Sequence, residues 1–257
     1  MGTNVDTDRA LAAIWSGIAR GQHHPAEWQG KLSLADAYRV QLGLLDRYVA
    51  AGERHAGWKV GLTAKAMQEQ QRVHEPVLGF LLASGQRDSG AVFEFPRLIS
   101  PGFENELCIT VGRTLVGPGV TTEQARAAIG EVAPALEIVE RRGDFTADLA
   151  LALADNAQQK AFVTGAGRAP GDLDLAAVSV DVVVNGAHQE RALGAAVLGN
   201  PAASIAWLAN KLAELGRRLD AGMRVMSGSF TRQYPLSRGD RVESRFEPLG
   251  AVRAEFR

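Results

Sequence analysis

The fold is decided by residues 102–142, which read GFENELCITVGRTLVGPGVTTEQARAAIGEVAPALEIVERR. Within this stretch, residues 104–111 have the composition of a β-strand, whose side chains point alternately to two faces. The odd-numbered positions form a mostly apolar face, which is typical of a side packed on the core. Glu104 and Glu106 share the other face, with their Cβ atoms roughly 7 Å apart, so two carboxylates meet on one side of the strand.

A second strand-like segment, residues 132–139, is apolar on both faces except for Glu137. Burying one uncompensated carboxylate is costly, and a cation shared with Glu104 and Glu106 would remove that cost. No histidine or cysteine pair lies nearby in the sequence, so a hard, oxygen-preferring ion such as Mg²⁺ or Mn²⁺ is the expected metal. A solvated strand face would explain Glu104 and Glu106 alone, but it does not explain Glu137.

Length and composition limit the classes of protein that fit. The chain has 257 residues, 46% of them hydrophobic and 22% charged, which is ordinary for a soluble globular protein. A net charge of −1 without a basic run argues against a nucleic-acid partner. No apolar run approaches the ~18 residues of a membrane span, no signal-peptide pattern opens the chain, and the single cysteine, Cys108, fits a reducing compartment. We therefore expect a cytoplasmic protein without nucleic-acid or membrane partners.

The N-terminal part of the chain predicts a helical layer. Residues 8–20 and 33–51 have apolar side chains at helical spacing, and the second segment opens with a capping box at Ser33. No internal repeat or low-complexity linker divides the chain. We interpret residues 1–257 as a single catalytic domain, with a helical layer over 1–55 and a β-rich core over 56–257.

The C-terminal part predicts hairpins and one long helix. Asn185-Gly186 between two strand-like runs is typical of a type I′ hairpin, and residues 242–256 predict a terminal hairpin. Asn200-Pro201 begins a helix that we expect to reach about Leu219. Together with the N-terminal helices, these segments predict an α+β fold.

Two glycine-rich stretches are candidates for ligand contact. Lys59 shares its strand face only with two glycines and Thr63, which indicates a bare surface that a ligand approaches closely. An exposed lysine on an edge strand is the alternative. In the run GSFTR, Gly228 would let a ligand anion approach backbone N–H groups, or the run is a plain polar turn.

Three further polar positions have a less specific pattern. His74 lies in a predicted loop, where its titration range would suit acid–base work, although such a histidine is usually an ordinary loop residue. Asp155 follows an apolar stretch and is typical of a cap or turn. His23-His24 lies in a loop, and we expect this pair to be solvent-exposed and not to bind metal.

Six motifs together resemble one family over most of the chain. The run GWKVGLTAKAMQ at 57–68 is similar to its pattern G-x-K-[IV]-G-L-T-S-K-x-x-Q. The others are E-x-E at 104–106, P-A-L-E-[IVL]-[IV] at 134–139, D-N-A at 155–157, the H-P…A-W-L-A-x-K-L helix at 200–212, and G-S-[FL]-T-R at 228–232. The family is that of the 2-hydroxypentadienoate (2-keto-4-pentenoate) hydratases and the related 4-oxalocrotonate decarboxylases, within the fumarylacetoacetate hydrolase superfamily.

This resemblance implies a fold, a metal and an assembly. The fold is a fumarylacetoacetate-hydrolase-like mixed β-sandwich or roll core with N-terminal and flanking helices. Glu104, Glu106 and Glu137 match the positions of the metal ligands for Mg²⁺ or Mn²⁺. Lys59 matches a residue that lines the substrate site, and Arg142 (or its neighbour Arg141) matches an arginine after the metal strand. A homo-oligomer, a pentamer or decamer, is expected, and a complex with another pathway enzyme is conceivable.

The implied reaction is metal-assisted hydration of a 2-hydroxy-2,4-dienoate to a 4-hydroxy-2-oxo acid, in the meta-cleavage catabolism of aromatic compounds. Lys59 is the candidate for proton transfer or for holding the enolate oxygen, because desolvation can lower the pKa of a lysine. Asp155 is either a second acid–base group or a structural cap. Ser229, Thr231 and Arg142 are candidates for binding the substrate.

The chain also departs from the hydratase pattern. Where hydratases often carry P-D-[FY]-G, residues 76–79 read PVLG. Val77, which we place in the substrate site together with His74, therefore favours the decarboxylases or an apolar substrate tail. Where many members have D-N-A-S, residues 155–158 read DNAQ and are followed by Gln159 and Lys160, and this extra bulk and charge is expected to reshape one wall of the pocket.

Three alternatives to hydration stay open. Decarboxylation of a 4-oxalocrotonate-type acid would use the same metal site. Hydrolysis of a C–C bond in an acylpyruvate is less favoured, because only His74 hints at the histidine–glutamate pair that activates water. A non-enzymatic partner that stabilises another pathway enzyme is the fourth possibility, and intact metal ligands argue against it.

Overall fold

Helices and strands alternate along the chain in the computed structural model, which describes residues 6–257. The strands are β1 His55–Gly61, β2 Val77–Leu82, β3 Gln86–Asp88, β4 Ala91–Phe93, β5 Pro101–Val111, β6 Ile129–Glu140, β7 Gln159–Thr164, β8 Ser179–Val184, β9 Ala187–Leu193, β10 Arg224–Met226, β11 Tyr234–Pro235, β12 Arg241–Glu247 and β13 Gly250–Phe256. The α-helices are α1 Thr7–Ala19, α2 Leu34–Ala50, α3 Lys65–Gln70, α4 Thr122–Ala127, α5 Leu149–Ala154 and α6 Pro201–Glu214.

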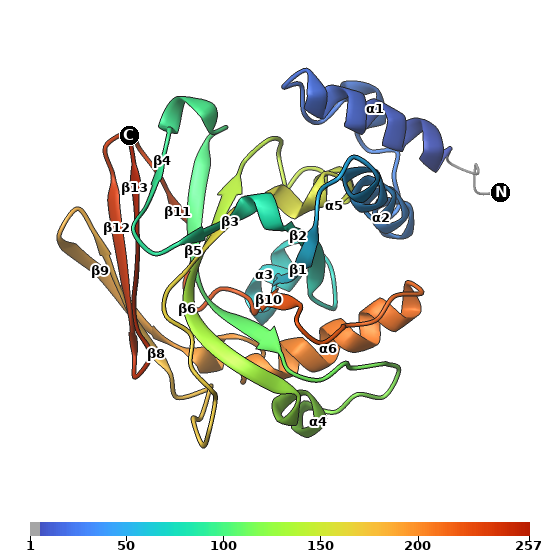
Figure 1. Ribbon diagram of the computed structural model, residues 1–257. Helices are drawn as coiled ribbons and strands as arrows, with labels where there is room; N and C mark the ends of the chain where they lie inside the picture. The colour runs from blue at the N-terminus through green and yellow to red at the C-terminus, as the bar shows by residue number, and fades with distance from the viewer. Residues whose placement is uncertain (1–5) are drawn as a thin grey trace.

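The strands form two sheets. An eight-stranded sheet has the order β2-β1-β10-β5-β6-β7-β3, with β11 beside β5, and a five-stranded sheet has the order β4-β13-β12-β8-β9. The larger sheet curls through the centre of the molecule, and the smaller one stands on the side opposite helices α1 and α2 (Figure 1). Parallel and antiparallel pairs are mixed, since β1 pairs with β10 in parallel and β5 with β6 antiparallel. The predicted α+β class is thereby confirmed.

Strand β5 connects the two sheets through one face and carries the acidic residues on the other. On the first face, Asn105 Oδ1 accepts a hydrogen bond from Ser244 Oγ of β12 at 2.5 Å. Cys108 lies on the second face and belongs to a small apolar cluster with residues of β6, β7 and β10. Most residues of β5 are buried on both faces. The side-chain alternation of β5 therefore separates packing between sheets from the acidic site.

The N-terminal helices form where the sequence predicts them. Helix α2 begins after Ser33, whose side chain and that of Asp36 form a capping box. Gln41 of α2 is buried, and its Nε2 donates to the carbonyl oxygens of Leu78 and Leu153 at 3.0 and 2.7 Å. This one amide ties α2 to strand β2 and helix α5. None of the helices described over 6–257 is long and apolar enough to cross a membrane.

The C-terminal hairpins are confirmed, and one helix is shorter than predicted. Strands β8 and β9 flank Asn185-Gly186, both with positive φ, and β12 and β13 form the terminal hairpin. Helix α6 ends at Glu214, five residues before the expected end near Leu219. Gly216 turns the chain at φ 69°, and Leu219 then forms a β-bridge with Leu115. The tertiary pairing of Leu219 therefore overrides the helical pattern of the sequence.

Candidate metal centre and active site

Three carboxylates meet on one face of the β5–β6 pair. The antiparallel register places Glu104 directly opposite Glu137. Glu106 lies two residues along β5 and therefore on the same face as Glu104. One carboxylate oxygen from each of the three lies within 4.8 Å of the other two. The strand pairing thus brings together the three acidic residues that the sequence singles out, and we call them the acidic triad.

Burial leaves several oxygens of the acidic triad without partners. Glu106 and Glu137 have no exposed surface. Glu106 Oε2 accepts a hydrogen bond from the backbone N–H of Gly228 at 2.8 Å. No hydrogen bond from residues 6–257 reaches Glu106 Oε1 or either carboxylate oxygen of Glu137. Because buried polar atoms are normally satisfied, these oxygens indicate ligands for a bound cation.

The electrostatics of the acidic triad also fit a divalent cation. Burial raises the pKa of Glu106 well above its usual range, and the charges of Glu137 and Glu104 raise it further. Burial likewise raises the pKa of Glu137 to about 7, although the ammonium group of Lys59 opposes this. With Lys59 beside three carboxylates, a doubly charged cation would bring the local charge to zero. The triad can therefore hold a divalent metal ion, and its oxygen-only donors favour a hard one.

Lys59 reaches the acidic triad from strand β1. Its Nζ lies 3.4 Å from Glu137 Oε1. Strand β1 runs between β2 and β10, so the alternative of an exposed lysine on an edge strand is wrong. A Cβ on Gly79, its partner on β2, would lie 3.2 Å from Lys59 Cγ, and one on Gly61 would lie 3.4 Å from Nζ. These glycines leave the space that the lysine side chain occupies.

The charge state of Lys59 differs from the sequence-based expectation. Burial by itself lowers the pKa of Lys59, but the neighbouring charges of Glu137, Glu104 and Glu106 raise it above its ordinary value. The expected lowering of its pKa is therefore wrong for this arrangement. Lys59 is a protonated donor beside the acidic triad.

Glu104 of the acidic triad lines a cavity of about 610 Å³, which we call the metal cavity, whereas Glu106 and Glu137 are fully buried and are not among its lining residues. Of the residues singled out from the sequence, Lys59, Val77, Glu104 and Gln158 line it. Sequence reasoning missed most of the other lining residues, which are Met67, Gln70 and Gln71 around α3, Ser100, Gly143, Asp144, Phe145, Thr146 and Gln233. They come from loops that only the folded chain brings together.

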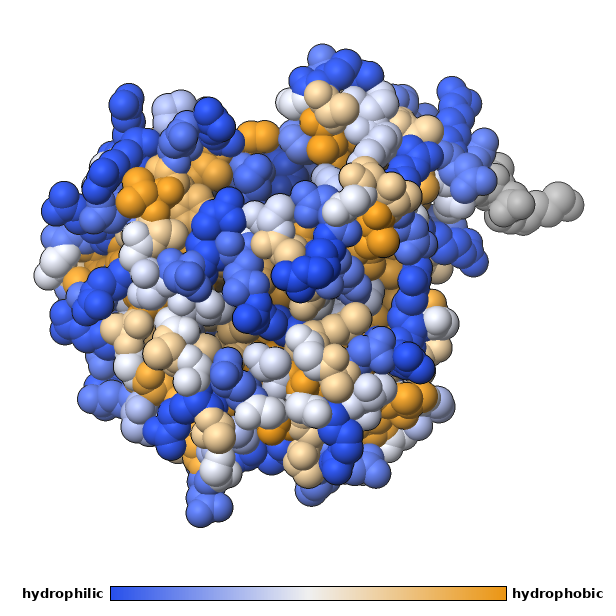
Figure 2. Space-filling view, viewed as in Figure 1, coloured by the Kyte–Doolittle hydropathy of each residue, from blue (hydrophilic) through white to orange (hydrophobic). Residues whose placement is uncertain are grey.

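Arg141, and not Arg142, lines the metal cavity. Strand β6 ends at Glu140, and Arg141, just beyond it, lines this cavity together with Val139. Arg142 points to the other side, where it lines a second cavity of about 510 Å³. That cavity lies between the N-terminal helices and β4, where the surface is hollowed in Figure 2. The structure therefore does not bring Arg142 to the predicted substrate site.

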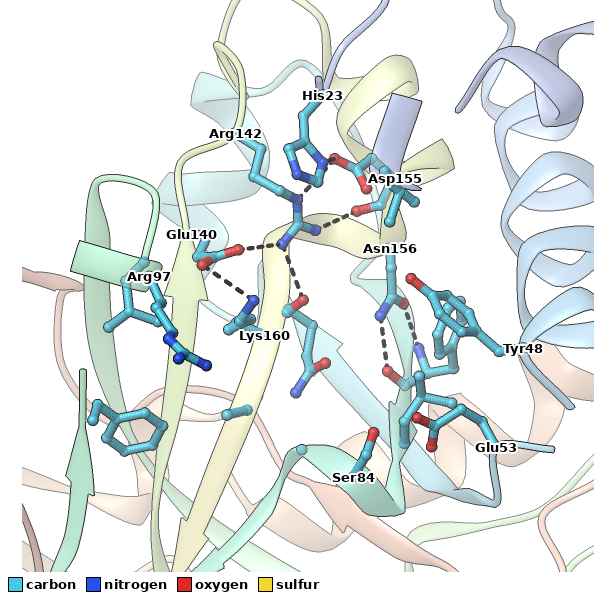
Figure 3. Close-up of a pocket in the computed structure, with 18 of the residues that line it drawn as sticks. His23, Tyr48, Glu53, Ser84, Arg97, Glu140, Arg142, Asp155, Asn156 and Lys160 are labelled. Atoms are coloured by element: carbon cyan, nitrogen blue, oxygen red, sulfur yellow. Dashed lines mark hydrogen bonds and ion pairs between the residues drawn. The ribbon is translucent and has the colours of Figure 1, made fainter. Parts of the chain in front are cut away.

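Arg142 is the centre of a buried ion network (Figure 3). Its Nε donates to Asp155 Oδ2 at 2.8 Å, and its Nη1 donates to Glu140 Oε2 at 3.3 Å. His23 Nδ1 and His24 Nε2 lie 3.5 and 3.8 Å from the same Asp155 oxygen, so the expectation of a solvent-exposed histidine pair is wrong. Burial raises the pKa of Asp155, but Arg142 outweighs this effect and holds it below its usual value. Asp155 is an ionised partner of Arg142 at the end of α5 and does not line the metal cavity.

Ser229 and Thr231 do not line the metal cavity either. Thr231 Oγ1 accepts a hydrogen bond from Asn105 Nδ2 at 2.8 Å and donates one to the carbonyl oxygen of Arg232 at 2.9 Å. The N–H of Gly228, which we expected to meet a ligand anion, instead orients Glu106. The GSFTR run therefore contacts strand β5 at Asn105 and Glu106 and does not line the metal cavity.

Two further residues lie outside the metal cavity. His74 is exposed and is not among the lining residues. Lys160 lines the second cavity, with Nζ 3.4 Å from Glu140 Oε1, and so does not form the wall expected of it. Val77, in contrast, is buried beside the metal cavity and presents an apolar side chain there.

One wall of the metal cavity is a left-handed turn that the sequence did not reveal. Asn156, Ala157 and Gln158 have φ angles of 56°, 49° and 63°, a region that L-residues seldom adopt. Ala157 and Gln158 line the metal cavity. The only sequence signal for this turn is Asn156, because asparagine tolerates such a backbone better than most residues.

Comparison with known proteins adds independent findings. The family described as "Fumarylacetoacetate (FAA) hydrolase C-terminal" matches residues 48–257. A 2-hydroxyhexa-2,4-dienoate hydratase of Comamonas testosteroni is 38% identical over 230 residues, which cover 88% of this chain and 87% of the relative. A 4-oxalocrotonate decarboxylase of Pseudomonas sp. (strain CF600) is 39% identical over 227 residues, which cover 88% and 86%. The relatives thus include hydratases and decarboxylases alike.

A solved structure extends the likeness to the whole fold. The 4-oxalocrotonate decarboxylase from Pseudomonas putida G7, complexed with magnesium and adipate, matches with a TM-score of 0.93 at 33% identity. The match covers 99% of each chain and therefore includes the N-terminal helices as well as both sheets. The predicted architecture, with its curled sheet, second sheet and N-terminal helices, is confirmed.

Proposed function

Since this chain belongs to the fumarylacetoacetate hydrolase family, we propose that it is a lyase that hydrates a 2-hydroxy-2,4-dienoate to a 4-hydroxy-2-oxo acid in the meta-cleavage catabolism of aromatic compounds. The observation that carries the proposal is the acidic triad with Lys59 beside it, of which Glu104 and Lys59 line the metal cavity. A 2-hydroxy-dienoate suits such a site because it presents two adjacent oxygen groups to a metal ion. The hydratases among the relatives support the same reaction.

We assign Glu104, Glu106 and Glu137 to hold Mg²⁺ or Mn²⁺. The buried oxygens of the acidic triad that accept no hydrogen bond and the magnesium in the related decarboxylase structure support this assignment. A bound ion supplies Lewis acidity, which stabilises negative charge at the substrate's 2-oxygen. The chain's own contribution is to fix the ligands: the strand register holds Glu104 opposite Glu137, and the N–H of Gly228 orients Glu106.

The residues around the acidic triad divide the remaining work. In hydration, the 2-hydroxyl group gives up its proton while C5 takes one up, and water then adds across C3 and C4, with its oxygen at C4 and a hydrogen at C3. Lys59 carries a proton beside the triad, and we assign it to hold the 2-oxygen or to deliver the proton. Leu62, Val77 and Val139 line the same cavity and keep the carbon chain in an apolar environment. Arg141, at the cavity, is our candidate for binding an anionic group of the substrate.

Decarboxylation of a 4-oxalocrotonate-type acid is the second candidate, and one observation favours it. Val77 is buried beside the metal cavity, so this position offers an apolar side chain and no group that could activate a water molecule. Loss of CO₂ needs no activated water, since the electrons left on carbon move towards the 2-oxygen. Hydrolysis of an acylpyruvate is not proposed, because no histidine is among the described residues that line this cavity.

The test uses purified protein, Mg²⁺ or Mn²⁺, and freshly generated 2-hydroxypenta-2,4-dienoate, with products identified by NMR. We expect 4-hydroxy-2-oxopentanoate to form, a chelator to abolish it, and Glu106→Gln to prevent it. Glu131→Gln, an exposed position on the same strand β6 as Glu137, is the matched control and should keep full activity. If the dienoate persists while 4-oxalocrotonate loses CO₂, hydration is refuted and the second candidate takes its place.

A further inference from the structure

The left-handed turn at residues 156–158 has a backbone that its residues do not favour. Its three φ angles lie between 49° and 63°, and none of the three residues is glycine. In this region the Cβ of an L-residue comes too close to a carbonyl oxygen. Residues in such a conformation persist only where the surrounding structure over-determines them. Two backbone hydrogen bonds span the turn, from the N–H of Gln158 to the carbonyl oxygen of Asp155 at 3.4 Å and from the N–H of Gln159 to that of Asn156, and contacts from outside the turn add to them.

The first residue of the turn is fixed to strand β2. Asn156 Oδ1 accepts a hydrogen bond from the N–H of Phe80 at 2.7 Å, and its Nδ2 donates to the carbonyl oxygen of Phe80 at 3.0 Å (Figure 3). The last residue, Gln158, donates from Nε2 to the carbonyl oxygen of Gly143 at 3.0 Å. These contacts fix the two ends of the turn separately, and neither of them joins one end to the other.

Arg142 joins the two ends. Its Nη2 donates to the carbonyl oxygen of Asp155 at 2.7 Å, just before the turn. Its Nη1 donates to the carbonyl oxygens of Gln159 at 3.2 Å and Gln158 at 3.5 Å, where the turn ends. The side chains of Asp155 and Glu140 hold the guanidinium in this orientation. A planar guanidinium can do this because its donors form a rigid fork.

We propose that Arg142 is a positioning residue for the reaction proposed above, acting on the substrate only through the turn. Ala157 and Gln158 line the metal cavity, whereas Arg142 lines the second cavity. A reacting group displaced by about 1 Å can slow an enzyme about 100-fold. The acidic triad lies on β5 and β6, and among the described residues no hydrogen bond joins its carboxylates to residues 156–158. Loss of Arg142 therefore lowers kcat/KM and leaves metal affinity unchanged.

The first experiment is Arg142→Lys, which keeps the positive charge beside Asp155 and Glu140 but cannot bridge both ends of the turn. We expect Mn²⁺ affinity within about twofold of the wild type, kcat/KM about 100-fold lower, and about tenfold faster amide hydrogen exchange over residues 155–160. The matched control is Arg126→Lys. Arg126 Nη2 also holds a loop, through the carbonyl oxygens of Gly171 and Leu173 at 2.9 Å, but none of these residues lines the metal cavity.

The second experiment separates positioning from general folding. Ala157→Gly removes the Cβ that disfavours the left-handed backbone, so the turn should need Arg142 less. In the Ala157→Gly background, Arg142→Lys should lower kcat/KM less than about tenfold, a strongly non-additive result. Additive losses, a parallel loss of Mn²⁺ affinity, or unchanged hydrogen exchange in Arg142→Lys would each overturn the proposal. Hydrogen exchange and Mn²⁺ titration need no substrate, so a failure of the proposed reaction itself is recognised separately.

Discussion

In the metal-free protein, Glu137→Gln is expected to raise thermal stability even though it removes a proposed metal ligand. Glu137 is fully buried, and its carboxylate lies within the acidic triad. Burial raises its pKa from 4.5 to about 7, although Lys59 opposes this. Glutamine has nearly the same shape and can accept a hydrogen bond from Lys59 Nζ, which lies 3.4 Å from Glu137 Oε1. The substitution thus removes a buried charge while keeping the packing.

The pKa values of Glu137 in the unfolded and the folded protein determine the sign and the size of the change in the free energy of unfolding. Between pH 4.5 and about 7 the folded protein holds a proton that the unfolded chain has released, so stability falls as pH rises through this window. The full penalty, about 3 kcal/mol, is present above it. We expect the variant to regain about 1–3 kcal/mol of this penalty. The gain can fall short of the full penalty because Lys59 loses its ionic partner. At about 3 °C per kcal/mol, its Tm should be about 3–9 °C higher near pH 8 and equal near pH 4.5.

The assay is thermal unfolding in a chelator across this pH range, with Glu131→Gln as the exposed control on the same strand. Saturating Mn²⁺ should then reverse the order of the two proteins. An ion that binds only the folded wild type stabilises it by about 4.1 kcal/mol at 1,000 times its Kd, which exceeds the variant's advantage in chelator, whereas the variant gains much less. The reasoning is refuted if the variant is no more stable than the wild type in chelator near pH ~8, or if Mn²⁺ stabilises both proteins equally.

Three further outcomes test other parts of the structure. Arg141→Ala should raise the KM for the dienoate about tenfold, as loss of one ionic contact, with Mn²⁺ affinity unchanged; an unaltered KM would remove Arg141 from the substrate site. Asn156→Ala should lower the free energy of unfolding by about 2–4 kcal/mol in urea titrations, because the buried N–H and carbonyl of Phe80 lose their partners. A change below ~0.5 kcal/mol would show that these two hydrogen bonds do not hold the turn on β2. Cys108 is 3% exposed, and burial raises the pKa of its thiol to about 12. It should therefore react with a thiol reagent only on unfolding. Labelling of the native protein would instead show that the small apolar cluster around Cys108 opens.

Strands β5 and β6 show how far sequence reasoning reaches. The two-residue period of a strand correctly places Glu104 and Glu106 on one face. Strand β6 ends at Glu140, so this period does not choose between Arg141 and Arg142, of which only Arg141 lines the metal cavity. The register that sets Glu137 opposite Glu104 cannot be obtained from the strand period, because it depends on how two separate strands pair.

The features that sequence reasoning missed depend on contacts between distant segments. The left-handed turn is held by Phe80 and Arg142, which lie well before it in the chain. His23 and His24 look like an exposed loop pair until Asp155 is packed against them. The lowered pKa expected of Lys59 failed for the same reason, since the charges of the acidic triad outweigh burial only when the strands have assembled. Local pattern identifies these residues but does not assign their neighbours.

The register of β5 against β6 has a consequence for folding quality. These strands have 11 and 12 residues, and a slip of one residue in their pairing would turn Glu137 to the opposite face. Such a misaligned molecule could look compact and still lack one of the three ligands. Metal uptake would therefore act as a proofreading step, because only correctly aligned molecules gain the stability that the ion confers. A freshly refolded sample could be sorted by this property alone, with retained metal marking the correctly paired fraction.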